Sequence, residues 1–214
     1  MFYDFVKRLL DIIGSIFGII IFSPLMLVIA LAIKLDCPGP VLANKDTPMR
    51  VGKDGKLFRM YKFRSMIPGA HKLLYNDPKM KKYLEELKKN SYKLVDDPRV
   101  TRVGKFLRKT SLDELPQFFN ILKGEMSLVG PRAYYPFELE EQQKKYPESR
   151  EFVKVILSAK PGLTGLWQVS GRSNINFDKR VEFDTQYVQR RSILFDIYLI
   201  LKTIPAVLAR RGAV

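Results

Sequence analysis

The chain has 214 residues, enough for one domain with a sizeable core, and its 46% hydrophobic content excludes a protein built of many membrane spans. Its 37 Lys and Arg outnumber 22 Asp and Glu, and the net charge of +15 favours a polyanionic partner: nucleic acid, anionic lipid or a phosphorylated substrate. One cysteine (Cys37) and one histidine (His71) exclude an internal disulfide, a Cys/His zinc site and a His-based triad within one chain, which leaves carboxylates, hydroxyls, Lys and Arg for chemistry.

The first predicted element is an apolar segment at residues 12–33, which contains no charged residue. As a straight helix it would measure about 33 Å, enough to cross a bilayer core. Ser23 and Pro24 lie at its middle, and a proline inside a helix costs about 3 kcal/mol. Two interpretations are open: a kinked spanning helix, or a re-entrant helix-break-helix. Basic residues flank both ends, which favours re-entrance with both ends on the cytoplasmic side.

The Pro-Gly-Pro sequence at residues 38–40 ends this helix and separates two regions. We expect a re-entrant membrane anchor at residues 1–36 and a cytosolic, membrane-associated catalytic domain at residues 37–214. Short strands are predicted within residues 41–66, around a turn at 52–55. The polar, Lys-rich residues 68–98 read as a solvated surface insertion without chemistry, with a helix at about 79–90.

Helical patterns dominate the rest of the chain. They cover residues 105–109, 112–122, 136–145, 151–158, 177–190 and 192–208. The predicted fold class is therefore α+β, mostly α, with a small β element.

The last predicted helix, residues 192–208, is apolar but contains Asp196 and Lys202. This composition is too polar to span a membrane and indicates an amphipathic helix at the bilayer interface; the alternative is an ordinary core helix. Arginines flank it on both sides, and each gains about 1 kcal/mol near anionic lipid. They are Arg190, Arg191, Arg210 and Arg211.

The run at residues 109–117 contains adjacent carboxylates, Asp113 and Glu114. The spacing of Ser111 and Glu114 predicts a capping box, which would place Asp113 in the first turn of a helix, where negative charge is favoured. Neighbouring carboxylates can share one Mg²⁺ ion. The alternative is that both acidic residues only cap the helix.

Two loops have compositions suited to phosphate. One ends in Gly130, Pro131 and Arg132, a turn that presents an arginine from a rigid backbone. The other, residues 160–172, contains three glycines and ends at Arg172, although its spacing is not that of a standard phosphate loop. Either loop alone could be structural. Together with the acidic pair and the anchor, they indicate a site for a phosphorylated substrate.

Four motifs make the chain similar to a known family. Residues 61–66 (YKFRSM), 111–117 (SLDELPQ), 126–132 (MSLVGPR) and 160–165 (KPGLTG) resemble the bacterial sugar transferase family, the monotopic phosphoglycosyl transferases. The similarity runs in order from Phe5 to about Arg211, and the apolar segment broken at Ser23 and Pro24 looks like that family's re-entrant anchor. Some members carry an additional N-terminal multi-span region and a further domain, and we expect here the minimal catalytic form.

The resemblance implies an undecaprenyl-phosphate sugar-1-phosphate transferase. In it, Asp113 attacks the β-phosphate of a UDP-sugar, releases UMP and holds the phospho-sugar on its carboxylate. Polyprenyl (undecaprenyl) phosphate then takes that group, which initiates polysaccharide or glycoconjugate assembly. Glu114 would act as a metal ligand beside Asp113 or in positioning, with Mg²⁺ as the cofactor. The resemblance also implies a location on the cytoplasmic face of the bacterial inner membrane, at an anionic bilayer.

The same resemblance implies a set of substrate-binding residues: Lys62, Arg64, Arg108, Gly130, Pro131, Arg132 and Arg172. Ala133 departs from the family pattern, since members often have proline there. Residues 97–104 and 167–172 look like those of members that use UDP-galactose or UDP-glucose, and an N-acetylated amino sugar is the alternative.

Other functions remain to be compared. A nucleic-acid-binding protein is disfavoured because the basic residues are scattered and no nucleic-acid motif is present. A direct glycosyltransferase would release UDP in place of UMP, and a non-catalytic membrane assembly factor would release neither. Neither a monomer nor a homodimer is excluded.

Overall fold

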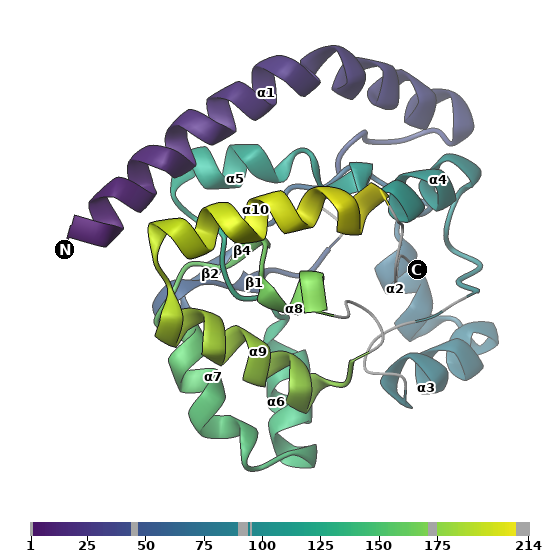
Figure 1. The fold of residues 1–214 in the computed structure, drawn as a ribbon. Coiled ribbons are helices and arrows are strands. Elements are labelled where there is room, and N and C mark those ends of the chain that lie inside the picture. Colours follow the sequence, from purple (N-terminus) through teal and green to yellow (C-terminus); the bar gives the residue numbers. More distant parts are fainter. Residues whose placement is uncertain (1, 44–46, 90–93, 95, 171–174, 209–214) are drawn as a thin grey trace.

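The structure, a computed structural model, describes residues 2–43, 47–89, 94, 96–170 and 175–208 (Figure 1). It is mostly helical with two small sheets, which confirms the predicted α+β, mostly α class. The α-helices are α1 (Phe2–Asp36), α2 (Ala70–Asn76), α3 (Lys81–Lys89), α4 (Arg102–Thr110), α5 (Gln117–Lys123), α6 (Pro136–Lys145), α7 (Ser149–Leu157), α8 (Leu166–Ser170), α9 (Phe177–Arg190) and α10 (Ile193–Leu208). Single 3-10 turns are η1 (Lys53–Gly55), η2 (Pro78–Met80) and η3 (Leu112–Glu114).

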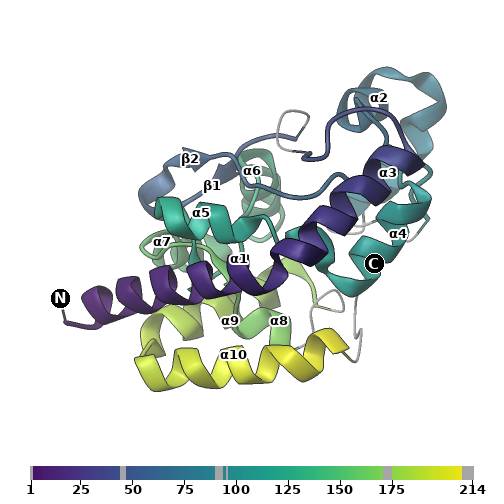
Figure 2. The same ribbon diagram turned by 90° about the horizontal axis from the view of Figure 1, so that it is seen from above.

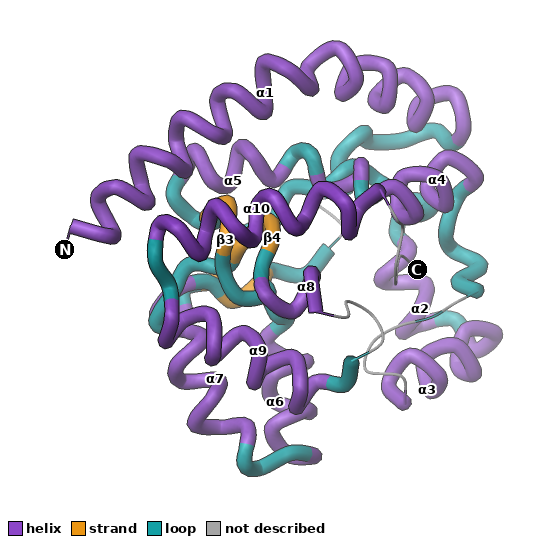
Figure 3. The backbone as a smooth tube through the Cα atoms, in the orientation of Figure 1, coloured by secondary structure: helices purple, strands orange, loops and turns teal. Residues whose placement is uncertain are grey.

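Two short strand pairs organise the interior. Strands β1 (Arg50–Val51) and β2 (Leu57–Phe58) are antiparallel, with Arg50 opposite Phe58. Strands β3 (Ser127–Val129) and β4 (Gly162–Thr164) are parallel, so the segments that follow both strands leave from the same end of the pair. Helices α5, α9 and α10 surround β3 and β4 in Figure 3. This parallel pair separates the two cavities described below.

Helix α1 is continuous through Pro24, so the predicted break is a bend within one helix (Figure 1). Proline has no N–H for the carbonyl oxygen of Ile20, four residues earlier. The hydroxyl of Ser23 donates to that oxygen at 2.9 Å and satisfies it. The Ser23–Pro24 pair therefore allows the helix to bend without leaving this carbonyl unpaired.

Both ends of α1 are attached to the same folded body (Figure 2). Near the start, Asp11 accepts hydrogen bonds of 2.9 Å from the hydroxyl of Ser127 and the backbone N–H of Leu128. At the far end, Asp36 accepts from the backbone N–H of Val103 at 3.1 Å. Between them, Phe22 stacks on Phe118 of α5 with ring centroids 6.3 Å apart.

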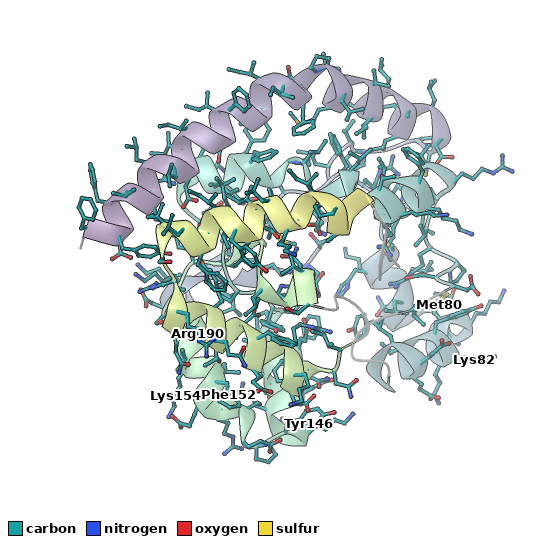
Figure 4. All side chains as sticks on the ribbon, in the orientation of Figure 1. Met80, Lys82, Tyr146, Phe152, Lys154 and Arg190 are labelled. Carbon is teal, nitrogen blue, oxygen red and sulfur yellow. The ribbon has the colours of Figure 1, made fainter. Side chains whose placement is uncertain are left out.

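The outer face of α1 is apolar and exposed, as its side chains in Figure 4 show. Among the described residues, α1 is the one helix long and apolar enough to cross a membrane. Its large exposed apolar side chains include Phe5, Ile13, Phe17, Ile20, Leu27, Val28 and Leu31. A hydrophobic surface of this extent on a folded protein indicates contact with a membrane or a partner.

Helix α10 reproduces the predicted C-terminal helix within one residue. Asp196 is buried and accepts from Lys7, Tyr3 and Tyr187 at 2.8, 3.1 and 2.7 Å. Its charge therefore points into the molecule, while Leu194 and Leu201 on the outer face are 80% and 61% exposed. The outer face of α10 is consequently more apolar than its sequence composition indicates.

Candidate active site

A cavity of about 410 Å³ lies between residues 60–67, η3, the loop after β3, α8 and the segment 68–98. Its charged and polar lining includes Arg50, Lys62, Arg64, Ser65, His71, Asp97, Arg99, Arg108, Ser111, Asp113, Glu114, Arg132, Trp167 and Gln168. The predictions for residues 62, 64, 108, 113, 114 and 132 therefore converge on one cavity. Its volume lies within the roughly 300–1,000 Å³ typical of small-molecule sites.

Described residues of the segment 68–98 form one wall of this cavity, which corrects its interpretation as a solvated surface insertion. Ala70, His71, Leu74 and Tyr75 of α2 line the cavity together with Leu94. The Arg99 guanidinium fixes this wall, because it donates to the carbonyl of Ala70 at 3.2 Å and pairs with Asp97 at 2.6 Å. Leu74, Met80 and Leu94 of this segment are buried.

The predicted capping box at Ser111 is wrong. Ser111 has φ = +59°, ends α4 and makes no capping hydrogen bond through its side chain. Asp113 and Glu114 therefore lie in the single 3-10 turn η3, and the next α-helix begins only at Gln117, after Pro116. A helix dipole consequently cannot be the source of the electrostatics at Asp113. The electrostatics at Asp113 are set first by its burial and then by a side chain from another segment.

That side chain is Lys62, whose ammonium lies between the two carboxylates. Lys62 Nζ is 2.6 Å from Glu114 Oε1 and 3.5 Å from Asp113 Oδ2. Burial disfavours the Lys62 ammonium, but the two carboxylates outweigh burial and raise the pKa of Lys62. Burial likewise raises the pKa of Asp113, against the opposing effect of Lys62. The result is a buried carboxylate on the cavity wall, with the Lys62 ammonium close to it.

The neighbouring arginines, Arg108 and Arg64, differ in the hydrogen bonds that they make within the fold. Arg108 donates through Nε to the hydroxyl of Ser65 at 3.0 Å and holds its guanidinium at the cavity. Arg64 donates to the backbone carbonyls of Pro40 and Cys37, so it holds the turn after α1, and its Nη1 has no hydrogen-bond partner among the described residues. Arg64 thus has a structural function that its sequence position did not indicate.

Arg132 is positioned by the loop that contains Gly130 and Pro131. The Gly130 N–H donates to Thr164 at 2.9 Å, and the Pro131 carbonyl accepts from Gly162 at 2.9 Å. A Cβ at Gly130 would lie 2.3 Å from the backbone oxygen of Lys160, so this loop requires glycine. The guanidinium of Arg132 lies 5.1 Å from the Trp167 ring, and its buried Nε has no hydrogen-bond partner in the part of the chain that the structure describes.

Asp184 on α9 holds the same loop from behind, and the sequence did not reveal it. Its Oδ2 accepts from the backbone N–H of Arg132 at 3.0 Å and from the Tyr134 hydroxyl at 3.4 Å. Burial raises the pKa of Asp184 to about 7. Its other oxygen, Oδ1, is buried and has no hydrogen-bond partner within the described ranges.

Arg50 of β1 also lines the cavity and was not predicted. It donates to the carbonyl of Ala133 at 3.0 Å, and its guanidinium carbon lies 3.3 Å from the centre of the Tyr135 ring. Pairing of β1 with β2 brings Arg50 here, and no local motif indicates this contact. The predicted contact Arg172 lies outside the described residues.

The residues suited to Mg²⁺ are the two carboxylates, Asp113 and Glu114. They converge on one cation already, the Lys62 ammonium, and Mg²⁺ in phosphate sites is typically held by one or two carboxylates plus substrate phosphates and waters. No group of three or more His, Cys, Asp or Glu suited to a metal is present in the part of the chain that the structure describes. The donor set therefore fits an ion bound together with a phosphorylated substrate, and does not form an all-protein cage.

Comparison with known proteins identifies the family. Residues 2–210 match the sequence model described as bacterial sugar transferase. The chain belongs to this family. Its match with undecaprenyl-phosphate galactose phosphotransferase of Salmonella typhimurium shows 47% identity over 213 residues, covering 98% of this chain and 42% of that protein.

Two further relatives differ in the sugar that their names specify. UDP-glucose:undecaprenyl-phosphate glucose-1-phosphate transferase of Escherichia coli K12 is 40% identical, over 92% of this chain and 39% of that protein. UDP-N-acetylgalactosamine-undecaprenyl-phosphate N-acetylgalactosaminephosphotransferase of Aeromonas hydrophila is 37% identical, over 99% and 45% respectively. The chain thus spans less than half the length of each of these three relatives.

Proposed function

We propose that this chain transfers a hexose 1-phosphate from a UDP-sugar to polyprenyl phosphate, with release of UMP and with Asp113 as the nucleophile. The observation that carries the proposal is the buried Asp113 beside the half-buried Glu114, joined by the Lys62 ammonium on the wall of an arginine-lined cavity. Membership of the bacterial sugar transferase family supports it.

In the first step, a carboxylate oxygen of Asp113 attacks the β-phosphorus of the UDP-sugar. The bond between that phosphorus and the bridging oxygen breaks, and UMP leaves with the electron pair. The sugar phosphate is then held on Asp113 as an acyl phosphate. In the second step, a phosphate oxygen of polyprenyl phosphate attacks the same phosphorus and Asp113 leaves as a carboxylate. Covalent catalysis of this kind divides one difficult displacement into two easier ones.

The cationic side chains of the cavity have distinct functions in this scheme. Lys62 holds Asp113 and Glu114 in place and offsets their mutual repulsion. Arg132 and Arg108 supply guanidinium groups that bind the diphosphate and stabilise the negative charge on the leaving UMP. When Mg²⁺ is bound by Asp113 and Glu114, it supplies further charge neutralisation to the phosphates.

We also propose that α1 is re-entrant and that the folded body lies on the cytoplasmic face of the bacterial inner membrane. A spanning helix would place Asp11 and Asp36 on opposite sides of the bilayer. Both residues instead bind backbone N–H groups of one folded body, at Leu128 and Val103. The bend at Pro24 and the apolar outer face of α10 agree with an anchor that enters and leaves one leaflet.

For the sugar, galactose or glucose is the proposed donor component. The galactose-specific name of the Salmonella typhimurium relative and the glucose-specific name of the Escherichia coli relative support this choice. An N-acetylated amino sugar is the alternative, which the name of the Aeromonas hydrophila relative supports. The experiment is to incubate the full chain with each UDP-sugar and undecaprenyl phosphate and to identify the released nucleotide. UMP supports phosphosugar transfer, UDP would indicate direct glycosyl transfer, and no release from any UDP-sugar would indicate a non-catalytic factor.

A further inference from the structure

A second cavity, of about 240 Å³, lies at the start of α1 and is distinct from the site around Asp113. Its lining contains five basic residues (Lys7, Arg8, Lys53, Lys160 and Arg191) and two acidic ones (Asp4 and Asp11). Ser127 of β3 and Lys160, just before β4, lie at this cavity. Arg132 and Trp167, which follow the same two strands, line the first cavity. The two cavities therefore occupy opposite ends of the parallel strand pair.

Two of the five basic residues, Lys7 and Arg8, already make contacts that stabilise the fold. Lys7 pairs with Asp196 at 2.8 Å, and Arg8 donates to the carbonyls of Ile121 and Leu122 at 2.6 and 2.7 Å. Asp11 accepts its hydrogen bonds from β3. These contacts fasten α1, so substitutions at Lys7 or Arg8 would disturb the fold as well as the cavity.

Lys53 and Lys160 differ from these two, because neither side chain makes a hydrogen bond or an ion pair with any residue that the structure describes. Lys160 is partly buried, and its surroundings do not balance its charge. Burial lowers the pKa of Lys160, and the cation Arg8 lowers it further; Asp11 opposes this effect, while Lys53 adds to it. Several cations therefore share this cavity, and an anion bound there would reduce the repulsion between them.

The cavity lies where the apolar faces of α1 and α10 begin. Along α1, Lys7 and Arg8 lie between Phe5 and Leu9, which are 71% and 48% exposed. At the start of α10, Arg191 is followed three residues later by Leu194, which is 80% exposed. Basic residues beside exposed apolar ones are typical of the bilayer surface, at the depth of the lipid phosphates.

We propose that this cavity binds the headgroup phosphate of an anionic membrane lipid. The inference rests on the proposed seating of α1 in the membrane, and is independent of the proposed phosphosugar transfer. The volume of about 240 Å³ suits a phosphate with part of its headgroup and is smaller than the cavity at Asp113. The acceptor substrate is a different ligand, since its phosphate has to reach Asp113, at the other end of the strand pair.

The first test uses the full chain in a neutral detergent and measures acetylation of individual lysines by peptide mass spectrometry. Dioctanoyl phosphatidylglycerol should reduce acetylation of Lys160 at least threefold, whereas dioctanoyl phosphatidylcholine, whose choline cation the cavity repels, should not. Lys144, which is 69% exposed on α6, serves as the internal control and should not change. Equal protection of Lys160 by both lipids, or none by either, would overturn the proposal. Equal protection by inorganic phosphate at the same concentration would replace the lipid by a free anion.

The second test compares two double variants that lose the same charge. Lys53→Gln with Lys160→Gln removes two of the remaining three cations of the cavity, and Lys144→Gln with Lys179→Gln removes two exposed lysines of α6 and α9. Native mass spectrometry should show at least fivefold less bound phosphatidylglycerol for the first variant and less than a twofold change for the second. Equal binding by the two variants, with matching circular dichroism and melting curves, would contradict the proposal. UMP release by the wild-type chain is measured separately, so failure of the transfer proposal is recognised independently.

Discussion

The backbone N–H of Phe63 donates a hydrogen bond of 2.9 Å to the carbonyl oxygen of Asp113. This bond joins the segment that carries Lys62 to the 3-10 turn that carries the two carboxylates. On its other side, the same segment is bonded to residues 41–43, where the Lys62 carbonyl accepts from Ala43 at 2.9 Å. Backbone contacts thus position the Lys62 ammonium at Asp113 and Glu114, and they remain when the side chain is changed.

This relationship predicts the effect of removing the ammonium alone. Lys62→Met should lower the rate of UMP release at least 100-fold, because the two adjacent carboxylates then repel each other and the incoming phosphates. Lys62→Arg should retain part of the rate, since it keeps the charge with a different geometry. Steady-state kinetics with a UDP-sugar measure both, and Lys144→Met is the matched control for the loss of one lysine. A rate for Lys62→Met within a factor of three of wild type would contradict this function of Lys62.

The burial of Asp184 leads us to predict that the free energy of unfolding depends on pH. Its pKa is about 7 in the folded chain, chiefly because it is buried, against an ordinary value of 3.8. Between these values the folded state binds a proton that the unfolded state has lost, so this group makes the free energy of unfolding fall as pH rises from about 4 to 7. The slope contributed is at most about 1.4 kcal/mol per pH unit.

The variant Asp184→Asn should remove this contribution and keep an acceptor for the Arg132 N–H. The melting temperature of the variant minus that of wild type should therefore increase from pH 5 to pH 8. Thermal unfolding in detergent at several pH values measures the difference, and Asp178→Asn on the same helix, α9, is the control substitution. Parallel curves for wild type and Asp184→Asn across this range would show that Asp184 does not titrate there.

The bend at Pro24 predicts the membrane topology. Cysteines introduced at residues 2 and 36 in a Cys37→Ser background should both react with reagents from the cytoplasmic side only. Pro24→Ala should shift part of the population toward a spanning form, because the apolar segment then forms an unbroken helix of sufficient length. Ser23→Ala should leave the Ile20 carbonyl unpaired while keeping the bend, and so should lower stability without this shift. Labelling of residue 2 only from the periplasmic side would exclude re-entrance.

The sequence predicted the site better where the chemistry lies in short motifs than where it depends on tertiary packing. The residues at 62, 113, 114 and 132 lie in the motifs that carry the family resemblance, and the same resemblance implied Arg108. All five line one cavity. Arg50 and Asp184 were missed, because strand pairing and the packing of α9 bring them to the site from distant positions. The helix start predicted at Ser111 is wrong because that residue adopts a left-handed conformation that ends α4, and the next α-helix begins at Gln117.

The fold likewise was predicted better where local sequence patterns decide it than where tertiary packing does. The ends of α6 and α9 agree with their periodic patterns, and α10 differs by one residue. The strands β3 and β4 were not assigned, since three residues are too few for an alternating pattern. The wall formed by residues 68–98 was mistaken for a solvated surface because its lysines outnumber the few apolar residues, such as Leu74 and Met80, that are buried.

The most direct test of the account is whether a sugar phosphate becomes attached to Asp113. Incubation of the wild-type chain with a UDP-hexose, without the lipid acceptor, should add the mass of one hexose phosphate and release UMP, and peptide mapping should locate the adduct at residues 109–117. Asp113→Asn should form no adduct and release no UMP, with its fold retained, because an amide is a poor nucleophile of nearly the same shape. An adduct on the Asn variant, or UMP release that requires both substrates to be present together, would contradict covalent catalysis by Asp113.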